Sequence, residues 1–133
     1  GESVWVGFFL YDLLGPFIAY AGSRGDAARA TRYATHRDAL RLALDRGGWD
    51  GAWYRRAYYD DGTPLGSAGG DECRIDAIAQ AWSVISGAGR PPRPAQAMEA
   101  VDAQLVDRAA GIIRLLAPPF DRGAHDPGYI KGY

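Results

Sequence analysis

The chain has little of what metal sites and disulfide frameworks require, with one cysteine and two histidines among 133 residues. A lone cysteine, Cys73, excludes an internal disulfide framework. Together these three residues give no zinc-type ligand spacing, so we expect no metal site. An excess of either charge is also missing, because the formal net charge is −1. That balance argues against a nucleic-acid partner, which needs a basic surface.

Residues 4–21 are almost uncharged and contain a single charged residue, Asp12. Their length approaches the roughly 20 apolar residues that cross a bilayer. Gly7, Gly15, Pro16 and the central Asp12 weaken a transmembrane interpretation, and no basic flank marks a cytoplasmic side. A signal peptide is also disfavoured, because the basic start and the cleavage motif are missing. We therefore expect a buried helix of a soluble domain, and no membrane span in this chain.

Four helical patterns of two kinds alternate along the sequence. Residues 3–21 and 74–86 are apolar on nearly every side and are predicted to be buried, although Pro16 should kink or split the first helix. Residues 26–46, and a helix after the Pro-rich residues 90–94, are apolar on one face only. Such alternation is typical of a helical toroid with an inner and an outer ring. We predict an all-α fold that is part of such a toroid.

Outer-to-inner connections of such a toroid emerge at one end. Residues 47–73 form one of these connections, and the residues after 108 form another. Within the first, residues 60–62 (Asp-Asp-Gly) favour a turn, so residues 54–59 and 63–66 are predicted to form a small β-hairpin. The pair of aspartates would then be a solvated turn rather than an acid–base pair.

The first connection contains the most informative segment, residues 49–62, with two Trp, three Tyr, two Arg and three Asp. Aromatic faces beside carboxylates and guanidinium groups can stack on a sugar ring and bind its hydroxyls. Trp49 and Trp53 are candidates for stacking, or for packing against the helices. Arg56 and Tyr58 are candidates for substrate binding, or for a structural ion pair.

A polar stripe on the third helix is a second candidate site. It contains Asp76, Gln80 and Ser83. Buried polar groups need partners, and the axis of a toroid supplies water or ligand. Substrate contact and a structural hydrogen-bond network both explain the stripe.

Several specific motifs span the chain. They are Trp49-Asp50-Gly51-x-Trp53-Tyr54-x-Arg56-Ala57-Tyr58, Asp60-Asp61-Gly62, Gly66-Ser67, Ile75-Asp76, Gln80-x-Trp82, Gly1-Glu2-Ser3-Val4-Trp5, Pro118-Pro119-Phe120-Asp121 and residues 126–133. Together they resemble glycoside hydrolase family 94, which contains the cellobiose, chitobiose and β-1,2-glucan phosphorylases. The chain is most similar to the C-terminal phosphorylase-type domain of cyclic β-1,2-glucan synthases.

The resemblance implies an (α/α)6 barrel that catalyses inverting phosphorolysis of β-glucosides. Phosphate, as co-substrate, attacks the anomeric carbon while one Asp protonates the leaving oxygen, and α-glucose 1-phosphate is released. The expected partner is a β-linked glucan, with no metal or organic cofactor. The expected substrate-binding residues are Trp49, Trp53, Arg56, Tyr58, Asp76, Gln80 and Tyr133, the last on the acceptor side.

The family's general acid lies in a Trp-Asn-Asp motif before the Gly-Glu-Ser-Val-Trp segment, and its phosphate-binding Glu-Asn-Gly-Gly and His region follows Tyr133. We therefore expect residues 1–133 to be part of a larger catalytic domain, to need the remainder of the parent chain, and to be inactive alone. Inner faces would then be uncovered, with Val4, Phe8, Trp82 and Ile85 exposed. The parent domain is expected on the cytoplasmic face of the inner membrane. The alternatives are a non-catalytic carbohydrate-binding module and a glucan transferase on the same scaffold.

Overall fold

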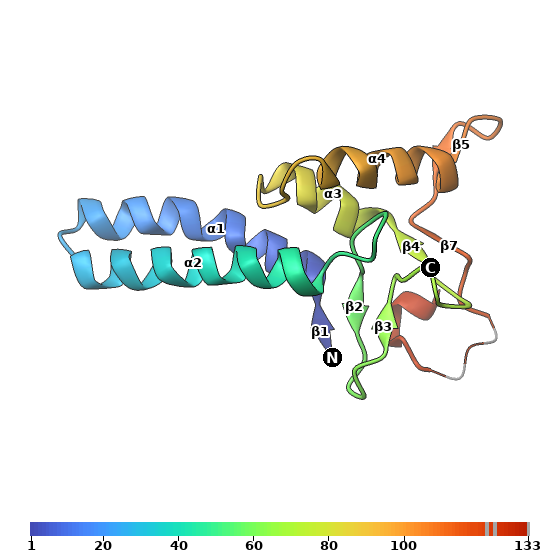
Figure 1. Cartoon of the computed structure of the whole chain (residues 1–133), viewed down its shortest axis with the longest axis horizontal. Coiled ribbons are helices and arrows are strands. Elements are labelled where there is room, and N and C mark those ends of the chain that lie inside the picture. The colour runs from blue at the N-terminus through green and yellow to red at the C-terminus, as the bar shows by residue number, and fades with distance from the viewer. Residues whose placement is uncertain (122, 124, 133) are drawn as a thin grey trace.

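The computed structural model describes residues 1–121, 123 and 125–132. Over these residues the protein is mostly helical, with two long helices side by side and two shorter ones packed at one end of them (Figure 1). Most of the short strands and a final 3-10 helix lie below the shorter pair in this view, whereas the strand at residues 106–107 lies beyond the end of the upper helix. The α-helices are α1 Val4–Ser23, α2 Ala27–Gly47, α3 Ala77–Ile85 and α4 Arg93–Gln104, and the 3-10 helix η1 is Gly128–Gly132.

The first two helices form an antiparallel hairpin with a tight turn. Gly25 provides the turn with a positive φ of 77°, and the Asp26 side chain caps α2 by accepting from the Arg29 N–H at 2.9 Å. The predicted bounds of both helices are confirmed to within two residues. Pro16 does not split α1, which continues through it to Ser23. Ser3 occupies the N-cap position, but its side chain makes no capping hydrogen bond.

The third helix begins later than predicted, at Ala77 rather than at residue 74. Ile75 and Asp76 instead form strand β4, which pairs with a strand far along the chain. Asp76 then caps α3, because its side chain accepts from the backbone N–H groups of Ile78 and Ala79.

In the part of the chain that the structure describes, seven two-residue strands form three antiparallel sheets, so the prediction of one hairpin in a helical fold was incomplete. The predicted hairpin is confirmed as β2–β3, and Gly62 in its turn has a φ of 84°. Strand β1 adds to β2, while β4–β7 and β5–β6 were not predicted. The strands are β1 Glu2–Ser3, β2 Ala57–Tyr58, β3 Pro64–Leu65, β4 Ile75–Asp76, β5 Val106–Asp107, β6 Ile112–Ile113 and β7 Leu116–Ala117.

Within these 133 residues α1 has an uncovered apolar face, as predicted, but Val4 and Phe8 do not lie on it. One face packs on α2 and α3, so Val4 and Phe8, which were expected to be exposed, are 7% and 0% exposed. Another face is open, and its exposed side chains include Val6, Phe9, Leu10, Leu13, Phe17 and Tyr20. On α3, Ile85 is 62% exposed as expected, whereas Trp82 is half-buried.

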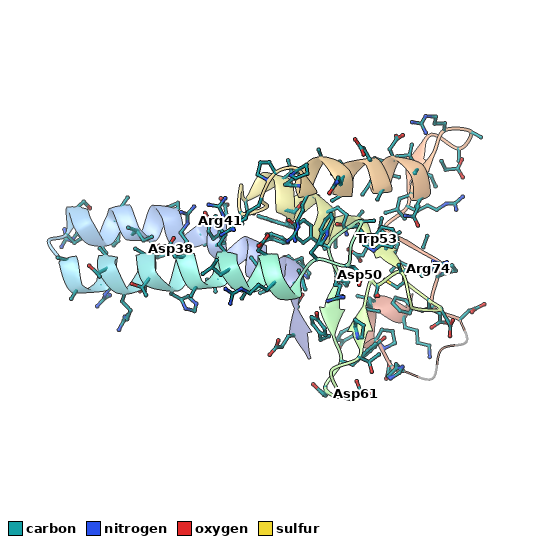
Figure 2. The ribbon with its side chains drawn as sticks, viewed as in Figure 1. Asp38, Arg41, Asp50, Trp53, Asp61 and Arg74 are labelled. Carbon is teal, nitrogen blue, oxygen red and sulfur yellow. The ribbon has the colours of Figure 1, made fainter. Side chains whose placement is uncertain are left out.

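By length and composition, α1 is long and apolar enough to cross a membrane, and 28% of its most apolar window is buried. However, α2 lies along it over most of its length and carries charged side chains such as Asp38 and Arg41 (Figure 2). Arg37 of α2 lies 3.8 Å from the ring centre of Tyr11 and donates to the Tyr11 carbonyl at 3.0 Å. Because α1 could not enter a bilayer without these charges, the two-helix hairpin favours a packed helix.

Candidate functional site

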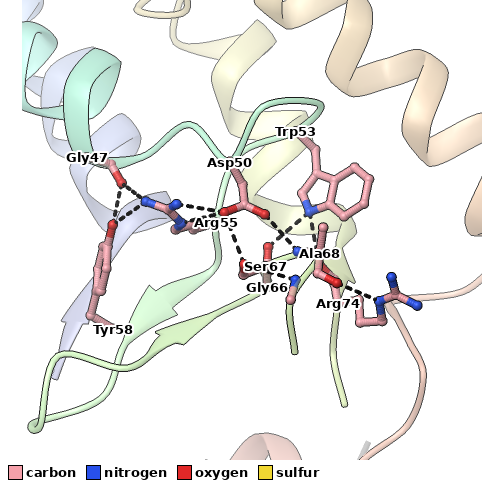
Figure 3. Close-up of polar contacts among 10 residues, drawn as sticks. Gly47, Asp50, Trp53, Arg55, Tyr58, Gly66, Ser67, Ala68 and Arg74 are labelled. Carbon is pink, nitrogen blue, oxygen red and sulfur yellow. Dashed lines mark hydrogen bonds and ion pairs between the residues drawn. The ribbon is translucent and has the colours of Figure 1, made fainter. Parts of the chain in front are cut away.

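The connection between α2 and α3 folds into a hydrogen-bonded platform against the helices (Figure 3). Trp53 anchors it, because its indole Nε1–H lies 3.0 Å from the Gly66 carbonyl and 2.9 Å from that of Arg74. The side chain is 8% exposed. Trp53 therefore has the packing role that the sequence left open, and it presents no free ring face to a sugar.

Asp50 ties two parts of the connection together. Its carboxylate accepts from Arg55 at 2.7 Å, from the Ser67 hydroxyl at 3.0 Å and from the Ala68 N–H at 2.7 Å (Figure 3). These partners saturate the carboxylate, which is 7% exposed. Asp50 is thus a structural residue, and Arg55 and Ser67 are partners that the sequence pattern did not indicate.

Tyr58 links the platform to the end of α2. Its hydroxyl donates to the Gly47 carbonyl at 2.5 Å and accepts from Arg55 Nη1 at 2.7 Å. The Gly47 carbonyl is one of the groups that a helix leaves without an intrahelical partner at its C-terminus. Tyr58 and Arg55 therefore cap the C-terminus of α2, because both side chains donate to the Gly47 carbonyl, and they position strand β2.

Gln80 is fully buried and clamps the platform onto α3. Its Oε1 accepts from the Tyr54 N–H at 2.7 Å, and its Nε2 donates to the carbonyls of Tyr54 at 2.7 Å and Asp76 at 2.9 Å. Both amide hydrogens are therefore used. Of the two alternatives for the polar stripe, these contacts favour a structural hydrogen-bond network, to which the buried Ser83 also belongs.

Asp76 is a buried carboxylate, 1% exposed, beside a guanidinium. Arg56 Nη1 lies 3.3 Å from its Oδ1, which also accepts from the Ile78 N–H at 2.8 Å. Burial raises the pKa of Asp76, and the charge of Arg56 opposes that rise. Asp76 is thus a helix cap and ion-pair partner, so the structural alternative holds for it as well.

An open cleft of about 420 Å³ lies where the β1–β2–β3 sheet faces the chain near η1. Arg56 and Tyr58 both line it, so the structure brings these two predicted residues together. Among the described residues Arg56 is bonded only through Nη1, which leaves Nε and Nη2 as free donors. The remaining lining includes Glu2, Ser3, Tyr59, Asp60 and Asp126. Carboxylates beside a guanidinium are suited to the hydroxyls of a sugar.

The profile of the glycosyl hydrolase 94 superfamily catalytic domain matches residues 1–133, the whole chain. The chain belongs to this family.

Similar curated proteins are glycan-processing enzymes of greater length. The cyclic beta-(1,2)-glucan synthase NdvB of Rhizobium meliloti (strain 1021) is 53% identical over 133 residues, which are 100% of this chain and 5% of that protein. A 3-O-beta-D-glucopyranosyl-beta-D-glucuronide phosphorylase of Paenibacillus borealis is 35% identical over 90% of this chain and 15% of its own length. An N,N'-diacetylchitobiose phosphorylase of Vibrio furnissii is 31% identical over 98% and 16%. The chain thus spans 5–16% of these three relatives.

Within this family 94 chain, the predicted substrate-binding residues divide into three groups. Arg56 and Tyr58 line the cleft. Trp53, Asp76 and Gln80 are buried in structural roles, and Trp49 packs edge-on to Tyr54 with ring centres 4.9 Å apart and Arg93 over its face. Tyr133 lies outside the described residues.

Glu2 was missed as a lining residue, although it belongs to a motif that carried the family resemblance. Glu2 lies before the first helical pattern, so no periodicity in the sequence indicated which way its side chain would face. The described residues hold no group of three or more His, Cys, Asp or Glu side chains placed to bind a metal ion.

Proposed function

We propose that this chain forms one wall of the sugar cleft in a family 94 domain that catalyses inverting phosphorolysis of β-glucosidic bonds. The match of the family profile to all 133 residues is the observation that carries the proposal. The 53% identity to a cyclic beta-(1,2)-glucan synthase favours a β-1,2-glucan as the substrate. Inorganic phosphate is the co-substrate, and the product is α-glucose 1-phosphate.

The proposed architecture is part of an (α/α)6 barrel with α1 and α3 in the inner ring and α2 and α4 in the outer ring. Two observations support it. The two apolar helices, α1 and α3, contact each other, and each is covered on one side by a more polar helix. The open apolar face of α1 is then a surface for further inner helices.

In this reaction the chain's residues bind and orient the sugar. Arg56 donates to hydroxyl oxygens through Nε and Nη2, while Glu2 and Asp60 accept from hydroxyl groups across the same cleft. Tyr58 and Asp76 hold β2 and the Arg56 side chain in position. The 133 residues contain no Trp-Asn-Asp motif, so we assign proton donation to a residue outside them.

The test uses the complete polypeptide that contains this chain, incubated with β-1,2-glucan and phosphate. Glucose 1-phosphate with the α configuration should accumulate, and its anomeric form is read directly by NMR. Arg56→Ala should raise the KM for the glucan at least tenfold, whereas Arg46→Ala, which alters an exposed arginine of α2, should leave it unchanged. A complete absence of glucose 1-phosphate would rule out phosphorolysis.

Transfer of glucosyl units between glucans is a second candidate, since the glucan synthase relative is named for synthesis. In that case the same incubation would change the lengths of the glucans without consuming phosphate. A parent protein on the cytoplasmic face of the inner membrane accompanies either proposal, and a fusion to a cytoplasmic reporter tests it.

A further inference from the structure

Three aromatic rings meet on the side of α1 that borders α3. Trp5 lies 6.3 Å from Phe9 and 6.4 Å from Trp82 between ring centres, and Phe9 lies edge-on to Trp82 at 5.2 Å. We call Trp5, Phe9 and Trp82 the aromatic shelf. Trp5 and Trp82 pack on the buried core but are only half-buried, and Phe9 is 37% exposed. The shelf therefore has a supported side and an open side.

Arg56 borders both the cleft and the shelf. The guanidinium carbon of Arg56 lies 5.9 Å from the Trp5 ring centre, while its Nη1 is bonded to Asp76. Ser3, two residues before Trp5, lines the cleft directly. Arg56 and Ser3 thus place the Trp5 ring next to the lining of the cleft.

The single charge of α1 lies on the same side of the helix. Trp5, Phe9 and Asp12 are spaced by four and then three residues, so they follow one face. Asp12 is exposed and has no hydrogen-bond or ion-pair partner among the described residues. A carboxylate at the end of an aromatic surface accepts hydroxyl hydrogen bonds from a ring stacked on that surface.

The composition distinguishes this stripe from the neighbouring open face of α1. That face meets the shelf at Phe9 and continues through Val6, Leu10, Leu13 and Phe17, with no charge, and it suits another apolar helix. Packing such a helix on the shelf would bury Asp12 without a partner, which costs several kcal/mol. The shelf, together with the guanidinium of Arg56 and the carboxylate of Asp12, instead offers the aromatic faces and polar groups that bind a sugar.

We infer that the aromatic shelf and Asp12 form a glucosyl subsite that extends the cleft along α1. The ligand is one glucose ring of a β-linked glucan, stacked on Trp5 and Trp82, with a hydroxyl directed to Asp12. The inference rests on the proposed function for the identity of the sugar, and on the geometry of α1 and α3 for the site itself.

The experiment measures binding of a β-1,2-linked glucotetraose to the complete polypeptide by calorimetry without phosphate. Trp5→Ala and Trp82→Ala should each raise Kd about tenfold, and Trp5→Phe should raise it less because a stacking ring remains. Asp12→Asn should raise Kd about threefold. Leu13→Ala, on the neighbouring apolar face of the same helix, is the matched control and should leave Kd unchanged.

A thermal melt of each variant separates binding from folding. An unchanged Kd in Trp5→Ala or Trp82→Ala overturns the inference, and so does an equal rise in Kd in Leu13→Ala. A lower melting temperature with unchanged Kd assigns the shelf to packing and likewise overturns it. If the variants weaken binding but no glucose 1-phosphate forms in any protein, the proposed reaction fails and the subsite stands. If glucose 1-phosphate forms with an unaltered KM for the tetraose in Trp5→Ala, the reaction stands and the subsite fails.

Discussion

The α1–α2 hairpin and the connection over residues 47–73 satisfy their side chains in opposite ways. The hairpin is regular, yet it leaves large apolar side chains open, with Phe17 53% and Tyr20 65% exposed. The connection has only four strand residues, yet the polar groups of its Asp50, Trp53 and Tyr58 side chains are hydrogen-bonded within the chain. A region can therefore be regular in secondary structure and still leave side chains without partners in this chain, and an irregular region can have its side chains paired.

The difference follows from what each region buries. An apolar helix face can be buried by any apolar neighbour, so the segment that buries it can lie far along the chain. Buried backbone groups of an irregular segment need partners at fixed distances and directions. The connection therefore has its partners at fixed positions nearby, Asp50 and Trp53 within it and Gln80 on α3, and a change at one of these should cost more than a change on the hairpin.

The largest effect is expected for Gln80→Ala. It removes the partners of the Tyr54 N–H and carbonyl, both buried, and should lower the free energy of unfolding by about 3 kcal/mol or more. Urea denaturation monitored by circular dichroism measures the loss. Gln96→Ala, at an exposed position of α4, is the matched control and should change stability by less than about 0.5 kcal/mol. A similar loss in both variants would refute the clamp role of Gln80.

A change on the open face of α1 should act on association instead of on folding. The isolated 133-residue chain is expected to self-associate through this face, since large apolar patches are rare on soluble monomers. Leu10→Gln combined with Phe17→Gln should shift the chain toward monomer with little change in melting temperature. Sedimentation velocity measures this shift. A wild-type chain that is monomeric at all concentrations would contradict the expectation.

The contrast also explains which predictions from the sequence succeeded. The helices of the hairpin were predicted to within two residues, because periodicity and the signals at Asp26 and Gly47 are local. The residues predicted to be exposed on α1, Val4 and Phe8, were wrong, because exposure depends on which side of the helix α2 and α3 cover. The strands β1 and β4–β7 were missed, because two residues carry no alternating pattern and their partners are distant.

At the candidate site, residue type indicated the chemistry but not the roles. The sequence located the polar and aromatic groups, and the alternatives for Trp53 and Gln80 could be resolved only by distances to the backbone. The aromatic shelf was not predicted at all. Trp5 and Trp82 belong to helices separated by more than fifty residues, and only packing brings their rings together.

A smaller effect is expected from Asp76, which connects the segment 47–73 to α3 through its ion pair with Arg56. Since burial raises its folded pKa, this carboxyl favours the protonated folded state, and its contribution to stability falls as pH rises from the ordinary value of 3.8 through the raised one. Asp76→Asn should flatten that fall in pH-dependent urea titrations, while it retains the cap of α3. Asp61→Asn is the control, because the contribution of Asp61 to stability changes with pH in the opposite direction. The Thr63 N–H lowers the pKa of Asp61, so its stabilisation is lost as pH falls. A steeper fall in Asp76→Asn than in the wild type would contradict the assignment.

The smallest effect concerns Cys73, which is fully buried two residues before β4. Burial, with a further contribution from the nearby Asp76, raises the pKa of its thiol to about 12. Alkylation requires the thiolate, so at pH 8 iodoacetamide should leave the folded chain unmodified in mass spectra. Labelling should rise only with the fraction unfolded in urea, where the thiol regains its ordinary pKa and access to solvent. Labelling that precedes global unfolding would show that the platform opens locally, and that the connection is less self-sufficient than its hydrogen bonds indicate.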